Sequence, residues 1–289
     1  MKSSTTAGYT ILELIVSMGL ALVVGAVAIA NFQGTHRMVR YDIERTSLNQ
    51  NLRSTLDILG MNVRLSGENL PGFFPAVLVA DNGNSDVLTI RRSVLDENLS
   101  ACAGVAASTT YPIIFADTSS SEPDCSYTNK GEVLLSWANS RIARGGTGLG
   151  YLYSRNHHWG EWFEWTAETD NTTTMFITPS SGVWTNSYDA LLSYAYVIEE
   201  WEFSLNGDTL QMVIDGDTAH PINVANQLTG FDVSVERKDG GVQSAFTSGD
   251  DWGEIAVLNI TLTGEESSGG RIISRSLRGS FFPRNVLSG

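Results

Sequence analysis

The sequence predicts an α+β protein in which one long N-terminal helix packs on an antiparallel, β-rich globular domain. The first observation is an apolar run, Leu14 to Ala30, without an ionisable group. The second is that apolar residues continue beyond it, to about residue 65, at the spacing of an amphipathic helix. The third is that short apolar or alternating runs, separated by Gly, Asn, Asp and Ser clusters, follow Pro71-Gly72.

Residues 9–32 form the first half of the predicted helix, and they are numerous and apolar enough to cross a bilayer. One carboxylate, Glu13, lies near the front of this segment. A carboxylate in hydrocarbon costs at least ~2.5–3.5 kcal/mol on insertion scales. An ionisable group in such a segment therefore indicates a function, and we expect it to have a partner.

Three interpretations of the N-terminus compete. A secretory signal peptide would have a shorter apolar stretch and a cleavage site after it, whereas this stretch contains Glu13 and continues into a helical pattern. A plain membrane anchor explains the length but gives Glu13 no partner. Cleavage between Gly8 and Tyr9 would remove a polar leader, residues 1–8, and leave an α-amine at the start of the helix. Only this third interpretation supplies a cationic partner.

The residues around this bond resemble the class III signal of type IV pilins and of type II secretion pseudopilins. The match consists of a short leader with Lys2, then Gly8, Tyr9, Thr10, and Glu13 as the fifth residue of the mature chain. The family usually has Phe where this chain has Tyr9. The resemblance implies a pilin-like fold, cleavage by a prepilin peptidase, N-methylation of Tyr9, and packing of the helix in a filament core. It also implies that Glu13 pairs with the N-terminal amine of a neighbouring subunit.

Elementary electrostatics favours the same pairing. An ammonium group against the carboxylate removes much of the penalty for burying either charge, and it also fixes the axial stagger of two helices. Along one straight helix the Tyr9 amine and Glu13 would be about 6 Å apart, at ~1.5 Å per residue. An intrachain pair would need a bent terminus, so we expect the amine to come from another subunit.

Residues 33–66 are predicted to continue the helix as its amphipathic half. The apolar stripe expected to be buried comprises Val39, Ile43, Leu48, Leu52, Leu56, Leu59 and Val63. Gly19 and Gly25 are positions where the helix could bend or allow close helix approach. Arg37 and Arg40 follow the apolar run, so a count of basic residues alone would place the downstream side in the cytoplasm. The leader must be cytoplasmic for cleavage, however, so we expect residues 67–289 to be periplasmic.

Residues 67–289 are predicted to be β-rich, either as one large domain or as a sheet domain with a sizeable insertion. We favour one domain whose antiparallel sheet packs on the second half of the helix. Predicted strands are Ala76–Ala80, Val87–Arg91, Ile113–Phe115, Val133–Ser136, Ala195–Phe203, Leu210–Ile214, Phe231–Glu236, Ile255–Thr263 and Ile272–Phe282. The glycine-rich segment Gly145–Gly150 lacks a phosphate-loop lysine and is interpreted as a flexible loop.

The order of segments in this domain is similar to that of PilW-type minor pilins and of the related J-type pseudopilins. The similarity comprises an acidic, aromatic strand at 197–203, Leu-Thr-Gly-Phe-Asp-Val at 228–233, a Leu/Ile/Thr strand at 257–263, and a basic strand before Arg284-Asn285. The family often ends in Leu-Arg-Asn, where this chain has Pro283 before Arg284-Asn285. The resemblance implies a minor subunit rather than a major pilin.

Cys102 and Cys125 are the two cysteines of the chain. In a domain outside the cytoplasm, such a pair is most simply one disulfide, worth roughly 3 kcal/mol by the loop-entropy estimate. Two free thiols are the alternative. The net charge of −14 argues against non-specific binding of nucleic acid, which needs a surface rich in Lys and Arg.

An aromatic segment is the most suggestive chemical feature of the domain. Its candidate surface-contact residues are His157, His158, Trp159, Trp162 and Trp165. The interpretations are an aromatic hairpin with its rings in the core, an adhesive surface for glycans, and a metal site. The core interpretation is favoured, and no metal or other cofactor is predicted. No zinc-protease, phosphate-loop or nucleophile-elbow motif occurs, so no enzymatic activity is predicted.

Together these observations predict a minor pilin that primes a type IV pilus or lies at its tip. Its expected partners are the prepilin peptidase, other minor pilins, the major pilin and the inner-membrane assembly platform. The expected location is the bacterial inner membrane, with one pass and a cytoplasmic N-terminus, and then the pilus on the cell surface. The alternatives are a type II secretion pseudopilin, or a tip adhesin that binds surfaces or glycans.

Overall fold

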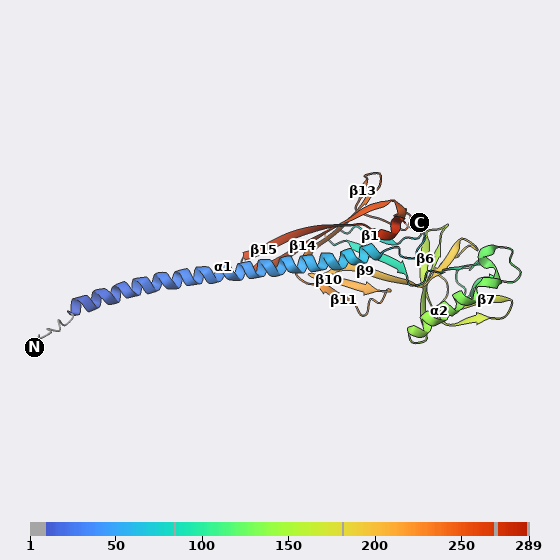
Figure 1. Ribbon diagram of the computed structural model, residues 1–289, viewed down its shortest axis with the longest axis horizontal. Coiled ribbons are helices and arrows are strands. Elements are labelled where there is room, and N and C mark those ends of the chain that lie inside the picture. Colours follow the sequence, from blue (N-terminus) through green and yellow to red (C-terminus); the bar gives the residue numbers. More distant parts are fainter. Residues whose placement is uncertain (1–9, 84, 181, 269–270, 288–289) are drawn as a thin grey trace, which may run out of the picture. The chain divides into compact units, whose positions relative to one another are not determined.

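The computed structural model of the chain describes residues 10–83, 85–180, 182–268 and 271–287, and it contains one long helix and a β-rich domain (Figure 1). The predicted α+β class is confirmed at this level. The chain forms two compact units. One consists of the described residues up to Gln50 and within Glu265–Arg275, and the other of those within Asn51–Gly264 and Ser276–Gly289.

The helix α1 runs without a break from Ile11 to Leu65. Its 55 residues span about 80 Å at ~1.5 Å per residue. Gly19, Gly25 and Gly34 do not interrupt it. An 18-residue window of α1 has a mean hydropathy of 2.4 and is 0% buried, so by length and composition α1 can cross a membrane.

The second half of α1 buries its apolar stripe, but the stripe is shorter than predicted. Leu48, Leu52, Leu59 and Val63 are fully buried and Leu56 nearly so, whereas Val39 and Ile43 are 48% and 62% exposed. Within the larger unit, Leu56 lies against Gly279, near the end of the strand β15 (Arg271–Phe281). The amide nitrogen of Asn51 also donates to the carbonyl of Asn226, at 2.8 Å. From Leu52 to Val63, the buried face of α1 therefore belongs to the core of the domain.

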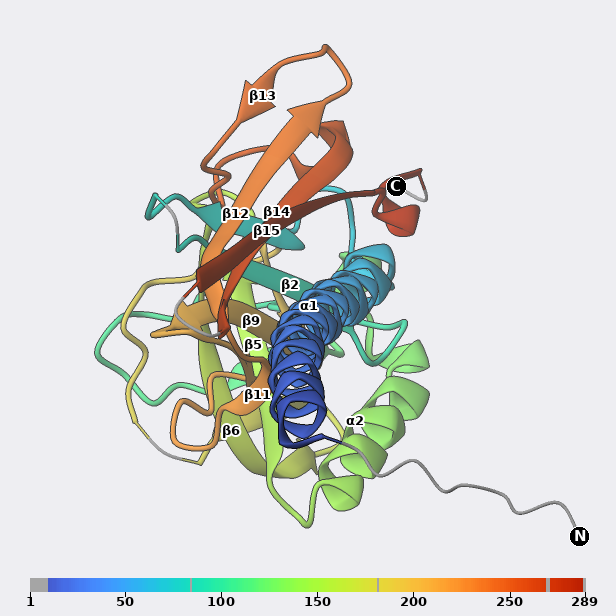
Figure 2. The ribbon, with the colours of Figure 1, turned by 90° about the vertical axis from the view of Figure 1, so that its left-hand side faces the viewer.

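Within the described residues, three antiparallel sheets replace the one that was predicted. The first has the order β1-β2-β9-β10-β11 and consists of β1 (Val77–Ala80), β2 (Val87–Ser93), β9 (Ile198–Asn206), β10 (Thr209–Ile214) and β11 (Ile222–Ala225). The second has the order β13-β12-β14-β15 and consists of β13 (Val242–Gln243), β12 (Leu228–Arg237), β14 (Ile255–Ser268) and β15 (Arg271–Phe281). Figure 2 shows β12, β14 and β15 side by side.

The third sheet has the order β3-β8-β5-β6-β7-β4. It consists of β3 (Leu99–Ser100), β8 (Ser193–Tyr196), β5 (Gly148–Ser154), β6 (Trp159–Asp170), β7 (Thr174–Pro179) and β4 (Ile113–Asp117). Short 3₁₀ turns lie at Pro123–Cys125, Tyr127–Asn129, Trp252–Glu254 and Arg284–Leu287. Neighbouring strands pair antiparallel, as β5 does with β6.

The predicted strand Val133–Ser136 is wrong, because these residues lie in the helix α2 (Gly131–Ala143). Val133 and Trp137, four residues apart and so on one helical face, are its buried residues, and they join the core of the six-stranded sheet. The Trp137 and Trp165 ring centroids are 5.0 Å apart. Arg141 of the same helix binds both oxygens of Glu168 on β6, each at 2.9 Å. The segment Val133–Ser136 is therefore part of an amphipathic helix.

The prediction of a flexible loop at Gly145–Gly150 is also wrong for residues 148–150, which belong to β5. Gly148 and Gly150 begin β5 and lie opposite Trp165 and Phe163 of β6. A Cβ at either glycine would overlap the ring it faces. These glycines therefore make room for two buried aromatic rings, and this is a role in packing rather than in flexibility.

Candidate functional site

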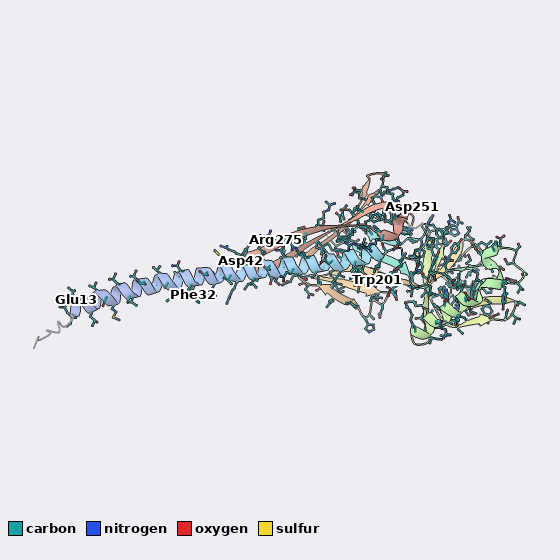
Figure 3. All side chains as sticks on the ribbon, in the orientation of Figure 1. Glu13, Phe32, Asp42, Trp201, Asp251 and Arg275 are labelled. Carbon is teal, nitrogen blue, oxygen red and sulfur yellow. A yellow bond between two sulfur atoms is a disulfide. The ribbon has the colours of Figure 1, made fainter. Side chains whose placement is uncertain are left out.

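Glu13 lies in the first turn of α1, where Figure 3 labels it. Its Oε2 atom accepts hydrogen bonds from the backbone N–H of Thr10, at 3.1 Å, and from the Thr10 hydroxyl, at 3.2 Å. In return, the backbone N–H of Glu13 donates to the Thr10 hydroxyl oxygen at 3.3 Å. Thr10 and Glu13 thus form a reciprocal capping box, which satisfies two N–H groups that no residue inside the helix can reach.

This pairing gives Glu13 an intrachain partner that the distance argument for the Tyr9 amine did not address. Thr-x-x-Glu before an apolar run is the sequence signal of a capping box, and the prediction overlooked it. A carboxylate at a helix N-terminus also interacts favourably with the helix dipole. Glu13 therefore has a partner within its own chain before any second subunit is present.

The apolar residues that follow Glu13 are exposed in the described chain. Ile11 is 82% exposed, and Leu14, Met18, Leu22 and Phe32 lie between 61% and 68%. No contact within the described chain removes this segment from water, so burying it requires lipid or other helices. Gly8 and Tyr9 lie outside the described residues, so the cleavage and methylation expected there remain predictions.

Cys102 and Cys125 are joined in a disulfide. Their Cα atoms are 5.6 Å apart, within the usual range for such a bond. Cys102 lies just after β3, at one edge of the six-stranded sheet, and Cys125 ends the first 3₁₀ turn. The backbone N–H of Cys102 donates to Ile114 on β4, the other edge strand in the sheet order. The disulfide therefore secures the segment that follows β4.

The candidate contact residues of the aromatic segment do not form one surface. Trp165 is fully buried and donates its indole N–H to Glu168 at 2.6 Å, so it belongs to the core. Trp162 is partly buried and packs edge-on against Tyr151, with centroids 5.2 Å apart. A continuous surface of five residues is thereby ruled out, because β6 alternates its side chains between two faces.

The remaining residues of the segment lie in the turn before β6 and at its first residue. The His157 ring stacks on Trp159 with centroids 4.4 Å apart, and its Nε2 atom is 3.2 Å from a carboxylate oxygen of Asp189. The Nδ1 atom of His158 lies 3.3 Å from the Tyr153 hydroxyl. Among the described residues, no group of three or more His, Cys, Asp or Glu could hold a metal ion.

Comparisons of the chain with protein-family models, with curated proteins and with solved structures found no match.

Proposed function

We propose that this protein is a filament subunit of the type IV pilin class, assembled through the first half of α1. The observation that carries the proposal is the exposed apolar segment of α1, which begins at a carboxylate and continues unbroken into a helix packed in a folded domain. A plain anchor needs only the apolar length. The carboxylate has a use if the segment leaves lipid and packs against the same segment of other subunits.

In this proposal the Thr10–Glu13 pair is the state of the subunit in the membrane. The capping box offsets part of the cost of Glu13 there, because it provides hydrogen bonds without a second charge. Cleavage after Gly8 then gives each chain an α-amine. Glu13 accepts the amine of a neighbour, which sets the stagger of the two helices.

Within this class we favour a minor pilin that primes a type IV pilus or lies at its tip, acting by assembly rather than by catalysis. The prepilin peptidase, other pilins and the assembly platform are its proposed partners, and the inner membrane and then the pilus its locations. The same helix would also serve a type II secretion pseudopilin. Identification of the pilin subunits that co-purify with this chain distinguishes the two systems.

The test separates the capping role of Glu13 from its charge. Glu13→Gln keeps an acceptor for the Thr10 N–H but removes the charge, Glu13→Ala removes both, and Thr10→Ala removes the hydroxyl that caps the helix but keeps the charge. If Glu13 sets the stagger, both Glu13 variants insert into the membrane normally but fail to enter filaments. If the Glu13→Gln variant entered filaments as well as the natural chain does, the role of Glu13 would be limited to capping the helix.

A second readout in the same experiment is the mature N-terminus. Mass spectrometry of the purified natural chain is expected to show methylated Tyr9 as its first residue. An intact Met1, or cleavage after the apolar run near residues 28–30, would reject the filament proposal as a whole.

A further inference from the structure

We propose that a cleft between two sheets of the domain binds a neutral oligosaccharide. The cleft has a volume of about 540 Å³. It lies between the end of α2 with β5 and β6 on one side and the β10–β11 hairpin on the other. This volume falls within the range of ~300–1,000 Å³ that is usual for ligand sites.

Asp215, just after β10, links the two sides of the cleft. One oxygen of this carboxylate accepts a hydrogen bond from the backbone N–H of Glu200 at 2.8 Å. The other accepts a hydrogen bond from Nη1 of Arg144 at 3.3 Å. The Asp215 side chain is 14% exposed and that of Arg144 31% exposed. The Arg144 guanidinium has five N–H donors, and this bond to Asp215 uses one of them. Arg144 can therefore donate to a ligand while Asp215 holds it in place.

The β6 side of the cleft and the rim supply acceptors. Glu164 on β6 is exposed, and within the described chain its carboxylate has no hydrogen-bond or ion-pair partner. Asp217, at the rim, binds Nδ1 of His220 at 2.9 Å, and both side chains are more than half exposed. The cleft therefore presents donors and acceptors together, within reach of one bound molecule.

Apolar groups separate these polar ones. Leu149, Ile214 and Ile222 line the cleft, and each is partly exposed. Trp162 lies close by, because its indole nitrogen is 3.9 Å from where a Cβ on Gly216 would be. That indole N–H has no acceptor in the described part of the chain. A sugar ring has C–H faces that pack on apolar and aromatic side chains, and hydroxyls that both donate and accept.

The distribution of charge decides between ligand classes. A cationic ligand would find two of the three carboxylates already bound, Asp215 by Arg144 and Asp217 by His220. An anionic ligand would meet Glu164, Asp215 and Asp217. A neutral polyhydroxyl ligand meets no like charge: its hydroxyls donate to Glu164 and Asp217 and accept from Arg144 and Trp162. Saccharide binding would therefore depend on hydrogen bonds rather than on net charge.

This proposal does not rest on filament assembly, since it concerns the isolated chain. The test is a titration of the full-length protein in detergent with maltotriose, cellotriose and triacetylchitotriose, followed by tryptophan fluorescence and calorimetry. At least one of the three is expected to bind with an affinity that changes little between low and high salt. Trilysine peptide and inorganic phosphate are the charged probes. The fluorescence change is expected to be lost in Trp162→Phe.

Matched variants locate the site. Glu164→Ala is expected to weaken saccharide binding at least about tenfold, since it removes a charged hydrogen-bond acceptor. Glu132→Ala, which removes an exposed carboxylate from the first turn of α2, is the control and is expected to bind normally. The proposal is overturned if none of the three saccharides binds, if Glu164→Ala binds as well as the natural chain, or if only a charged probe binds.

Discussion

At the scale of single residues, two neighbouring ion pairs join β2 to β9 from opposite faces of the sheet. Arg91 and Glu200 are directly paired, 2.6 Å apart, with side chains 10% and 9% exposed. Arg91 also donates to the carbonyl of Pro75 and lies over the Tyr151 ring at 5.0 Å. Arg92 and Glu199, the next pair, have side chains 29% and 28% exposed. The two Arg–Glu pairs therefore differ in how deeply they are buried.

Glu200→Gln is expected to lower the free energy of unfolding by about 3–5 kcal/mol, because it leaves the buried Arg91 charge without its counter-charge. Glu199→Gln is the comparison and should cost about 1 kcal/mol or less, since water screens the Arg92 pair and Glu68 remains 3.5 Å from Arg92. Denaturant unfolding of the detergent-solubilised chain measures both values. Equal losses in the two variants would contradict the assignment of Arg91–Glu200 as a buried pair.

At the scale of elements, the link between α2 and β6 makes stability depend on pH. Glu168 accepts from Arg141 and from Trp165, and its side chain is 5% exposed. Burial acts to raise the pKa of Glu168, but the hydrogen bonds from Arg141 and Trp165 outweigh it and hold the pKa below its ordinary value. The unfolded chain therefore binds this proton at a higher pH than the folded chain does, and protonation favours unfolding.

We expect Glu168→Gln to destabilise the protein by about 1–3 kcal/mol at neutral pH, the worth of charged hydrogen bonds. The difference between the natural chain and this variant should stay constant above the ordinary glutamate pKa of ~4.3 and shrink as the pH falls below it. Unfolding followed by tryptophan fluorescence at several pH values measures the difference. Glu164→Gln is the control, because an exposed carboxylate should show no such gap. If the difference in stability between the natural chain and Glu168→Gln stayed constant down to acid pH, protonation of Glu168 would not be the cause of the pH dependence.

The same elements show what the sequence could and could not predict. The predicted strands at 76–80, 87–91, 210–214 and 255–263 lie at β1, β2, β10 and β14, where apolar runs end at clear turn signals. An aromatic hairpin was an interpretation of the segment that forms β6, but its partner strand β5 was not predicted, because Gly148 and Gly150 suggest a loop until Trp165 and Phe163 are known to lie opposite them. That pairing joins residues 13 to 17 apart in sequence, and no local pattern reveals it.

The candidate site was predictable to a similar degree. The position of Glu13 in an apolar helix follows from the sequence alone, and so did the choice of Cys102 and Cys125 as a pair. The intersheet cleft could not be predicted, because Arg144, Glu164 and Asp217 come from three separate elements and only the fold brings them together. Trp165 was a candidate for surface contact because composition does not tell which face of a strand is buried.

At the scale of the whole molecule, the domain begins within α1 rather than after it. The larger compact unit starts at Asn51, and Leu52, Leu56, Leu59 and Val63 are buried. Each such side chain contributes about 1.5–3 kcal/mol by burial, so the four together equal much of the stability of an ordinary domain, ~5–15 kcal/mol. The last four turns of the helix are therefore structural, whatever the function of the first half of α1.

A soluble fragment that starts at Asn51 is accordingly expected to fold cooperatively and to bury these four side chains. A fragment that starts at Gly67 loses them and exposes the apolar surface they covered, so it should aggregate or unfold without a cooperative transition. Thermal unfolding monitored by circular dichroism, together with size-exclusion chromatography, compares the two. Quadruple replacement of Leu52, Leu56, Leu59 and Val63 by Ala in the longer fragment should reproduce the defect of the shorter one, because it removes the buried apolar groups but keeps the helix. If the fragment from Gly67 unfolded as cooperatively as the fragment from Asn51, α1 would be an appendage to the domain and not part of its core.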